Sequence, residues 1–465
     1  MRDLARLVVL AAVVAAAQPA SAVDLLDAWR AAQQNDLEYR AAQSAREAGA
    51  ARREQGASLW RPSVQFSGTV GVANNDTATR GAQFSAPGMG SANGVDFDTS
   101  INGGTATRWA LQARQPLVNR ERDAQRRQLE LAADIAEIEW SGAEQALMLR
   151  TAERYFDLVL AAETLRVLER QQASVAKENV EANDRFRLGD VAVTDTHEAA
   201  ARLEAVRAQV LAAQSQLELA RAAFADTTGL AGDGLKPLGA KAGAGADAAL
   251  PLAQWLADAK ARNPQLRAQL AAVEVAASEA AKFDAAAAPT IDVVAQVGQD
   301  RLNGNGDFGD ASNRQNNALI GVQLNVPLYT GGLRSAKQTE TLRLAEKAAT
   351  DAERGAQQVA QQTRAAWLGL TTGAGRVAAL GEALAASRSR LDATRVGRAA
   401  GERTTLDVLN AENDAANAEL ALLQARVKLL LDRLRLDALA GQLDESRLSA
   451  VNSALAHAEA PNRMP

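Results

Sequence analysis

The stretch GERTTLDVLN, residues 401–410, interrupts a helix-rich region with a glycine and places Asp407 six residues after it. The stretch GDVAVTD, residues 189–195, has the same arrangement, with its glycine followed six residues later by Asp195. Glycine ends helices readily because it adopts the left-handed conformation without steric cost. The two stretches therefore predict two helical hairpins, each with a carboxylate just beyond its turn.

Proline-free intervals outline the longest elements of the chain. Proline is absent from residues 117–236 and 328–460, and both intervals are rich in Ala, Leu, Glu, Gln and Arg, which favour helices. Apolar residues at alternating spacings of three and four, typical of coiled coils, run along the second helix of each interval. Each half is thus predicted to contain one very long helix and one shorter helix: 118–186 and 191–226, then 331–396 and 403–438.

Short segments of alternating polarity precede each long helix. A helix is predicted at the start of each half, over 24–58 and 251–286. The alternating segments predict four strands, over about 62–73, 105–117, 289–299 and 317–328. Gly, Asn, Asp and Ser dominate the residues between the strands of each pair, and these predict long exposed loops over roughly 74–104 and 300–316.

The alternation of the four strands has two interpretations. About ten alternating residues per segment are typical of outer-membrane barrels, but a soluble sandwich with one wet face would look similar. Trp60 and Tyr329, at the ends of the first and last strands, favour the membrane because aromatic residues anchor at its interface. Four strands cannot close a barrel and an open edge is not viable in lipid, so membrane strands would require several copies to pool them.

The same order of predicted elements occurs in both halves of the chain, which predicts an internal twofold sequence repeat that follows a signal peptide. Residues 1–22 have a charged start, an apolar core and an Ala-Ser-Ala end, which indicate a secretory signal peptide. The first repeat is predicted over 23–250 and the second over 251–456, followed by a tail at 457–465. Each repeat ends in an equatorial segment, 227–250 and 439–456, expected at mid-height of the helical part. The fold class is thus mainly α with membrane β strands.

Composition argues against an enzyme and against several ligand classes. The chain has no cysteine and two distant histidines, so a zinc site or a Cys/His nucleophile is not expected. Phosphate-binding and dinucleotide-binding glycine patterns are absent, and no cofactor is predicted. The net charge of −5 argues against a nucleic-acid partner.

The chain resembles the TolC family of outer-membrane channel proteins. The residues that carry the resemblance are RFRLGDVAVTD (185–195), GERTTLDVLNAEN (401–413), NVPLYTGGLRSA (325–336), ARQPLVNRERDAQ (113–125) and ARNPQLRAQLAAV (261–273). The resemblance covers nearly all of the chain after residue 22, in order and in both halves.

The resemblance implies a homotrimer in the outer membrane of a Gram-negative bacterium. Its twelve strands, four per protomer, would form one β-barrel, and its helices a coiled-coil tunnel through the periplasm. Such channels export proteins or small toxic compounds. Their partners are periplasmic adaptors and inner-membrane transporters, either ABC exporters or proton-driven pumps.

The resemblance also implies roles for residues beside the two turns. Gly189 and Gly401 match the turns at the periplasmic tip. Asp407 matches an acidic ring at the pore constriction, and Asn410 stands where a second acidic ring is usual. The remaining four residues match a latch that keeps the tip closed: Arg403 would bond Thr194 and Asp195, and Arg398 replaces a tyrosine and is expected to form an ion pair.

Simpler interpretations exist for each of these residues. Asp195 and Asp407 lie at helix starts, where aspartate commonly caps the helix. Arg403 could be a solvated surface residue. A periplasmic adaptor, with one helical hairpin and a small β module, and a purely structural coiled-coil protein are the alternative functions.

Overall fold

The computed structural model describes residues 23–88, 90–239, 250–307, 309–453 and 455. They fall into two compact units: the first combines parts of 1–48, 134–271 and 349–465, and the second combines 49–133 and 272–348. The predicted signal peptide at 1–22 and tail at 457–465 lie outside the described residues, as do residues 240–249 of the first equatorial segment.

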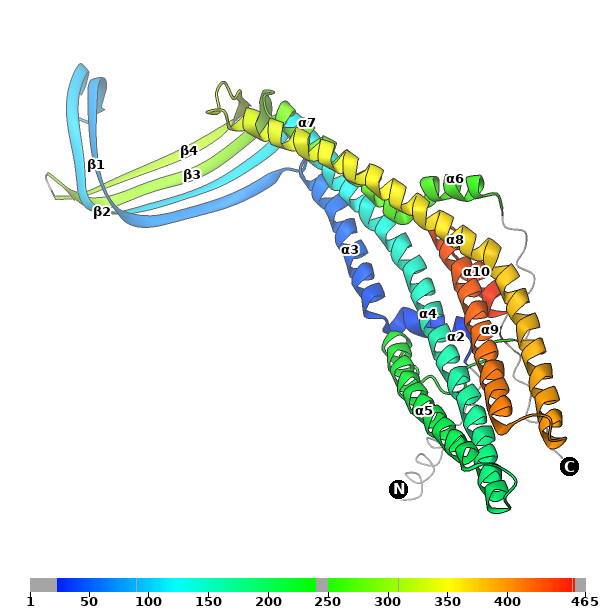
Figure 1. Cartoon of the computed structure of the whole chain (residues 1–465). Coiled ribbons are helices and arrows are strands. Elements are labelled where there is room, and N and C mark those ends of the chain that lie inside the picture. The colour runs from blue at the N-terminus through cyan, green and yellow to red at the C-terminus, as the bar shows by residue number, and fades with distance from the viewer. Residues whose placement is uncertain (1–22, 89, 240–249, 308, 454, 456–465) are drawn as a thin grey trace, which may run out of the picture. The chain divides into compact units, whose positions relative to one another are not determined.

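The element types of the first half of the chain recur in the same order in the second half (Figure 1). Among the described residues, each half has two short helices, two strands, a very long helix and a shorter one, and the second half ends with one further short helix. The first half contains α2 (Leu25–Asn35), α3 (Leu37–Ser58), β1 (Ser63–Ala86), β2 (Gly90–Val118), α4 (Arg120–Arg187) and α5 (Val193–Thr228). The second contains α6 (Leu252–Arg262), α7 (Pro264–Ala285), β3 (Thr290–Gly306), β4 (Gly309–Asn325), α8 (Leu333–Ala399), α9 (Thr405–Leu439) and α10 (Glu445–Asn452).

The first unit is helical, and α9 lies at its centre. One side of α9, from Val427 to Leu434, joins a core built from α2, α4, α5 and α10. Its other side, from Leu422 to Leu436, joins a core with Trp255 of α6 and with α8. Burial on two sides fits the many apolar residues that α9 buries along its length.

The predicted helices over 24–58 and 251–286 are wrong in one respect, because each is two helices. Asp36 separates α2 from α3, and its Oδ1 accepts a hydrogen bond from the Tyr39 amide at 2.8 Å. Asn263 separates α6 from α7, and its Oδ1 accepts from the Leu266 amide at 3.0 Å. Both side chains cap the second helix, and Pro264 occupies the first helical position that proline prefers.

The second unit contains one antiparallel sheet in the order β1-β2-β3-β4. The predicted loops over 74–104 and 300–316 are wrong, because most of their residues continue the strands. In these polar stretches the two strands of each hairpin pair with each other, and this pairing provides hydrogen-bond partners for their backbone amide and carbonyl groups. Bulges on β2 accommodate glycines in the left-handed region, Gly94 with φ 77° and Gly103 with φ 60°.

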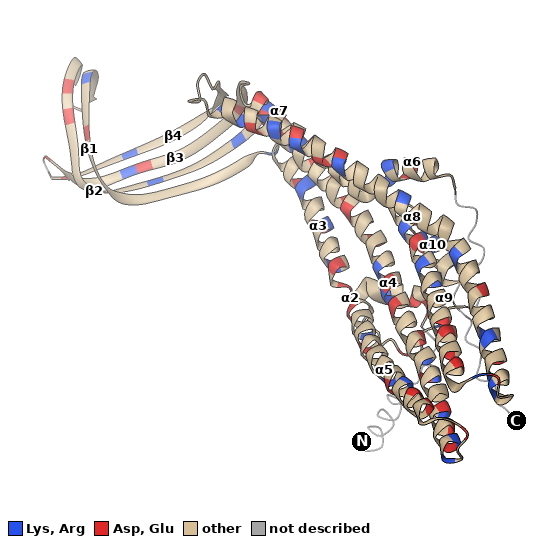
Figure 2. Cartoon of the chain, viewed as in Figure 1, with Lys and Arg blue, Asp and Glu red and all other residues tan. Residues whose placement is uncertain are grey.

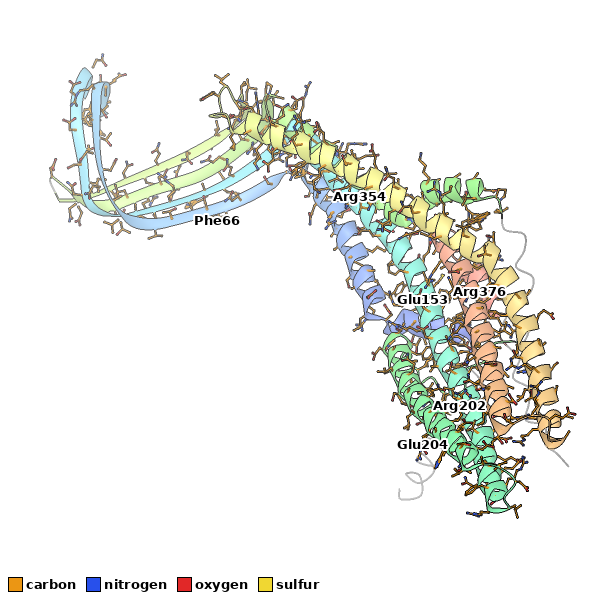
Figure 3. All side chains as sticks on the ribbon, viewed as in Figure 1. Phe66, Glu153, Arg202, Glu204, Arg354 and Arg376 are labelled. Carbon is orange, nitrogen blue, oxygen red and sulfur yellow. The ribbon has the colours of Figure 1, made fainter. Side chains whose placement is uncertain are left out.

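The two faces of the sheet differ in polarity near the helices. Val64, Phe66 and Val70 of β1 share a face with Trp109 and Leu111 of β2 and are highly exposed. Phe66 is labelled on β1 in Figure 3. Charged residues are sparse on the strands and dense on the helices (Figure 2). The opposite face carries the polar partners: Ser63, Gln65, Ser67, Thr69, Arg108, Gln112 and Arg114.

None of the described helices combines the length and the sustained hydropathy that crossing a membrane requires.

Candidate functional site

The two glycine turns have the same backbone geometry. Gly189 has φ 83° and Gly401 has φ 80°. After α4, the amide of Asp190 donates to the Arg185 carbonyl at 2.9 Å; after α8, the amide of Glu402 donates to the Gly397 carbonyl at 2.8 Å. This is the paired hydrogen-bond pattern with which a left-handed glycine ends a helix.

We expect Gly401→Ala to lower the free energy of unfolding by about 1–2 kcal/mol, because an L-residue is strained in the left-handed region. No atom lies within 4 Å of the position that a Cβ would take at Gly401, so the cost is that of the backbone alone. The control is Gly375→Ala in α8, which has equally open space and no positive φ. It should stabilise the helix by about 0.5–1 kcal/mol. Urea unfolding of both variants checks the opposite signs.

Asp407 completes the cap of helix α9, in which Thr404 is the N-cap residue. Its Oδ2 accepts from the Thr404 amide at 2.9 Å and from the Thr404 hydroxyl at 3.0 Å, and its own amide donates to Thr404 Oγ1 at 3.1 Å. The hydrogen bond from the Thr404 backbone is the main reason that the pKa of Asp407 lies below its ordinary value. Asp195 stands at a matching offset, but no side chain caps α5, which begins after Ala192. The two aspartates therefore have different local roles.

The latch residues taken from the resemblance do not meet within this protomer. Arg403 and Thr194 are exposed and Asp195 is half-buried. Among the described residues, no hydrogen bond or ion pair joins Arg403 to Thr194 or Asp195. The stem of Arg403 instead lies against Gly397, where an added Cβ would come within 2.9 Å of Arg403 Cγ. Asn410 is exposed on α9.

Arg398 does form an ion pair, and its partners lie on α4. Its guanidinium pairs with Glu178 and, at 3.1 Å, with Glu181. The side chains of Arg398 and Glu178 are only 13% and 8% exposed. Burial lowers the pKa of Arg398, and the charge of Glu412 opposes that shift. The pair ties the end of the α8–α9 hairpin to the α4–α5 hairpin.

Further charged residues continue this connection along the helices. Arg395 pairs with the buried Glu412 at 2.7 Å, and Ser174 of α4 donates to the same carboxylate. Glu419 of α9 pairs with Arg170 of α4 at 2.6 Å and with Arg388 of α8 at 3.0 Å. We call this set the charge seam: Arg170, Ser174, Glu178, Glu181, Arg388, Arg395, Arg398, Glu412 and Glu419.

The charge seam was not predicted from the sequence, although a signal for it exists. Arg388 and Arg395 are seven residues apart on α8, as are Glu412 and Glu419 on α9. Charges at heptad spacing on neighbouring helices often pair across a coiled coil. An apolar patch accompanies the seam, in which Leu409 of α9 packs with Val175 of α4 and Val206 of α5.

Comparison with known sequences identifies the family. The family described as "Outer membrane efflux protein" matches residues 28–230 and 255–442.

The chain belongs to the outer membrane efflux protein family.

Relatives and solved structures agree with this assignment. The alkaline protease secretion protein AprF of Pseudomonas aeruginosa is 28% identical over 96% of this chain and 90% of its own length. The outer membrane protein TolC of Escherichia coli is 26% identical over 78% of this chain and 75% of its own. The crystal structure of the Campylobacter jejuni CmeC outer membrane channel matches with a TM-score of 0.68 and 15% identity, covering 93% and 90% of the two chains. The protein is thus an outer-membrane channel of the efflux and secretion class.

The family assignment decides between the alternatives left open by the sequence. A periplasmic adaptor should have one helical hairpin, whereas this outer membrane efflux protein has two, α4–α5 and α8–α9, and four strands. A purely structural coiled coil would leave the sheet without a role. Trp60 is partly buried and Tyr329 is 87% exposed beside the sheet, and their role as interface anchors stays a prediction.

Arginines on the polar face of the sheet are paired across strands. Arg108 of β2 pairs with Asp300 of β3, and Arg114 pairs with Asp292 at 2.5 Å. The Asp292 side chain is 1% exposed, so this second pair is well shielded on the carboxylate side. In this outer membrane efflux protein the polar face therefore carries little uncompensated positive charge. Among the described residues, no group of three acidic or histidine side chains is placed to hold a metal ion.

Proposed function

We propose that three copies of the chain form one channel, with their sheets joined in a twelve-stranded barrel. The supporting observation is that β1 and β4 are both open edges of a four-stranded sheet with one apolar exposed face. An open edge is unstable in lipid, and pairing β1 of one copy with β4 of the next removes every edge. The apolar face would then meet lipid, and the polar face with its paired arginines would line the pore.

The helical end of this channel is proposed to be the gate, opened by docking with an inner-membrane transporter and its periplasmic adaptor. Asp407 would contribute one carboxylate per copy to a ring at the narrowest point, with Asn410 adding no charge. Carboxylates around one axis attract cations and raise one another's pKa. The capping hydrogen bonds from Thr404 act in the opposite direction on Asp407.

The charge seam is proposed as the main latch of the closed gate. Arg398 holds the α8–α9 hairpin to α4 through the nearly buried carboxylate of Glu178. Arg395 pairs with the nearly buried Glu412 of its own hairpin and also donates to Ser174 of α4 at 3.3 Å. Buried ion pairs hold two elements in register, and they break when a partner stabilises another arrangement. Arg403, Thr194 and Asp195 remain proposed as an additional contact, made between protomers, since they do not meet within one.

The cargo is proposed to be a secreted protein. AprF, a protease secretion protein, matches 96% of this chain. An ABC exporter and an adaptor would complete such a type I system. Efflux of small compounds with a proton-driven pump is the second candidate, since CmeC and the family description refer to outer-membrane channels and efflux.

The first experiment tests the channel itself. Outer-membrane fractions should contain a trimer that dissociates on heating in detergent, and the purified trimer should conduct ions weakly in planar bilayers with the gate closed. A monomer that stays in the periplasm would contradict the proposal and favour the adaptor or scaffold interpretation.

A further inference from the structure

The hairpin formed by β1 and β2 continues well past the other two strands. The last β2–β3 pair is Asn102 with Asn305, but β1 and β2 stay paired to their ends at Ala86 and Gly90. We call residues 75–86 and 90–101 the ribbon. Beyond its base no other strand pairs with it within the described part of this chain. A two-stranded ribbon with both edges free is marginally stable and open to further pairing.

The ribbon has one charged face and one face that is apolar in its outer part and carries Asn75, Thr77 and Thr99 near its base. Its register pairs Thr79 with Phe97, Ala82 with Val95, and Phe84 with Ala92. From one of these pairs to the next, one of the two strands always advances by two residues. Side chains two residues apart on a strand point to the same face, so all three pairs lie on one face. Phe84 and Phe97 are 45% and 42% exposed there. The other face carries Asp76, Asp96 and Asp98, with Arg80 paired to Asp98 at 2.6 Å.

The apolar face of the ribbon continues the polar face of the sheet. Between Ala73 and Asn75 the extra residue lies on β2, so β1 keeps its alternation through the bend. Ser63, Gln65 and Thr69 of the polar face are thus followed on the same side by Thr79, Ala82 and Phe84. A face that turns from polar to apolar once it leaves the sheet indicates a change in what it contacts.

The ribbon bends toward that face. A hollow of about 450 Å³ lies at the bend and is lined by Thr69, Arg108, Asp300, Asn313 and Gln315 of the polar face, together with the β1 residues around Asn74. Most residues that line the hollow belong to the polar face, which fits a sheet that curls toward that side. Figure 1 shows the ribbon turning sharply away from the direction of β3 and β4. The base is held by Ser100, which donates to Asp307 at 2.9 Å, and by the buried Ile101.

We propose that the three ribbons of the trimer meet over the outer mouth of the barrel, with their apolar faces packed against one another. This inference rests on the proposed trimer, because the polar face is the pore side only in that assembly. The ribbon is long enough to reach the barrel axis. Twelve strands about 4.8 Å apart and tilted about 40° enclose a barrel about 12 Å in radius, whereas twelve ribbon residues span about 40 Å. The occupant of the apolar face is therefore a second copy of this chain, and the charged face remains in water.

Cross-linking tests the proposal directly, because the chain has no cysteine. Ala82→Cys places a thiol on the apolar face, and the matched control Ser85→Cys places one on the charged face three residues away. A disulfide requires Cβ atoms about 3.5–4.5 Å apart. Oxidation of intact outer membranes with copper phenanthroline should link two protomers of the Ala82→Cys trimer and leave the Ser85→Cys trimer unlinked. Equal linking at both positions, or none at Ala82 in an intact trimer, would overturn the ribbon contact, and absence of any trimer would overturn the trimeric channel as well.

A labelling experiment tests whether the ribbons cover the mouth. Gln112→Cys places a thiol on the pore side of β2, and a polyethylene-glycol maleimide added to whole cells reaches it only from outside. Adding Phe84→Asp and Phe97→Asp should separate the ribbons. If the ribbons otherwise leave the mouth open about a tenth of the time, the rate of labelling should then rise about tenfold. The control adds Ser85→Asp and Ser91→Asp on the charged face and should leave the rate unchanged. Equal rates in the two backgrounds would contradict the cover.

Discussion

Replacing Arg398 by alanine should open the helical end of the channel and raise its single-channel conductance severalfold. The change removes the cation that faces Glu178 and Glu181, and Glu178 is left buried without its ion-pair partner. Breaking a buried pair by removing one member costs about 3–5 kcal/mol, which exceeds the few kcal/mol that separate two conformations of a switch. The closed arrangement should therefore lose its advantage. Planar-bilayer recordings of wild-type and variant trimers measure the effect.

Two companion variants separate a latch from a general loss of stability. Arg403→Ser removes an exposed arginine only five residues away and should change conductance less. The double exchange Arg398→Glu with Glu178→Arg restores opposite charges and should bring conductance back toward the wild-type value. Wild-type conductance from an intact Arg398→Ala trimer would refute the charge seam as the main latch.

Asp407→Asn should abolish most of the cation selectivity of the channel while preserving the fold of the tip. The asparagine oxygen can still accept from the Thr404 amide, whereas the ring loses its three charges. Reversal potentials in a salt gradient measure the selectivity. Asp407→Ala should remove both functions and also cost about 1 kcal/mol of stability through the lost cap. Asp190→Asn, an exposed carboxylate beside the other turn, is the control and should leave selectivity unchanged; unaltered selectivity in Asp407→Asn would refute the ring.

The pH dependence of Asp407 follows from its hydrogen bonds. The amide of Thr404 holds its pKa below the ordinary value of 3.8 within one protomer. A depressed pKa in the folded state stabilises the cap above the unfolded pKa, and this contribution is lost as pH falls through the folded value. Cation selectivity should therefore persist at neutral pH and disappear on strong acidification. Disappearance near pH 6 would show that repulsion within the ring outweighs the cap.

Local chemistry explains which parts of the fold could be predicted from the sequence. Gly189 and Gly401 ended the long helices where expected, because a left-handed turn at a helix end favours glycine. The long helices were readable from the proline-free intervals. The breaks at Asp36 and Asn263 were missed, since one capping residue inside a helical pattern is a weak signal. The ribbon was assigned to a loop because its Gly, Asn and Ser content favours turns, whereas cross-strand pairing decides its structure.

The candidate site depended on contacts between segments far apart in the sequence. An ion pair was expected at Arg398, but its partners on α4 could not be identified without the packing of α8 against α4. Asp407 acts as a cap within one protomer, and its ring can exist only among three. Arg403, Thr194 and Asp195 do not meet within one protomer, so their roles stay predictions.

The two-sided burial of α9 limits how far the proposed gate can travel. From Leu422 toward its C-terminus, α9 packs against two apolar cores. Between its N-terminus and Leu422, the charge seam and the small patch around Leu409 are its main contacts with other helices. The segment from Leu422 to Gly401 could then rotate as a rigid body about Leu422, and it is about 30 Å long at 1.5 Å per residue. A rotation of about 10° would displace the end of this segment by about 5 Å. In the proposed trimer, three such rotations would increase the diameter of the pore at the tip by about 10 Å without disturbing either core.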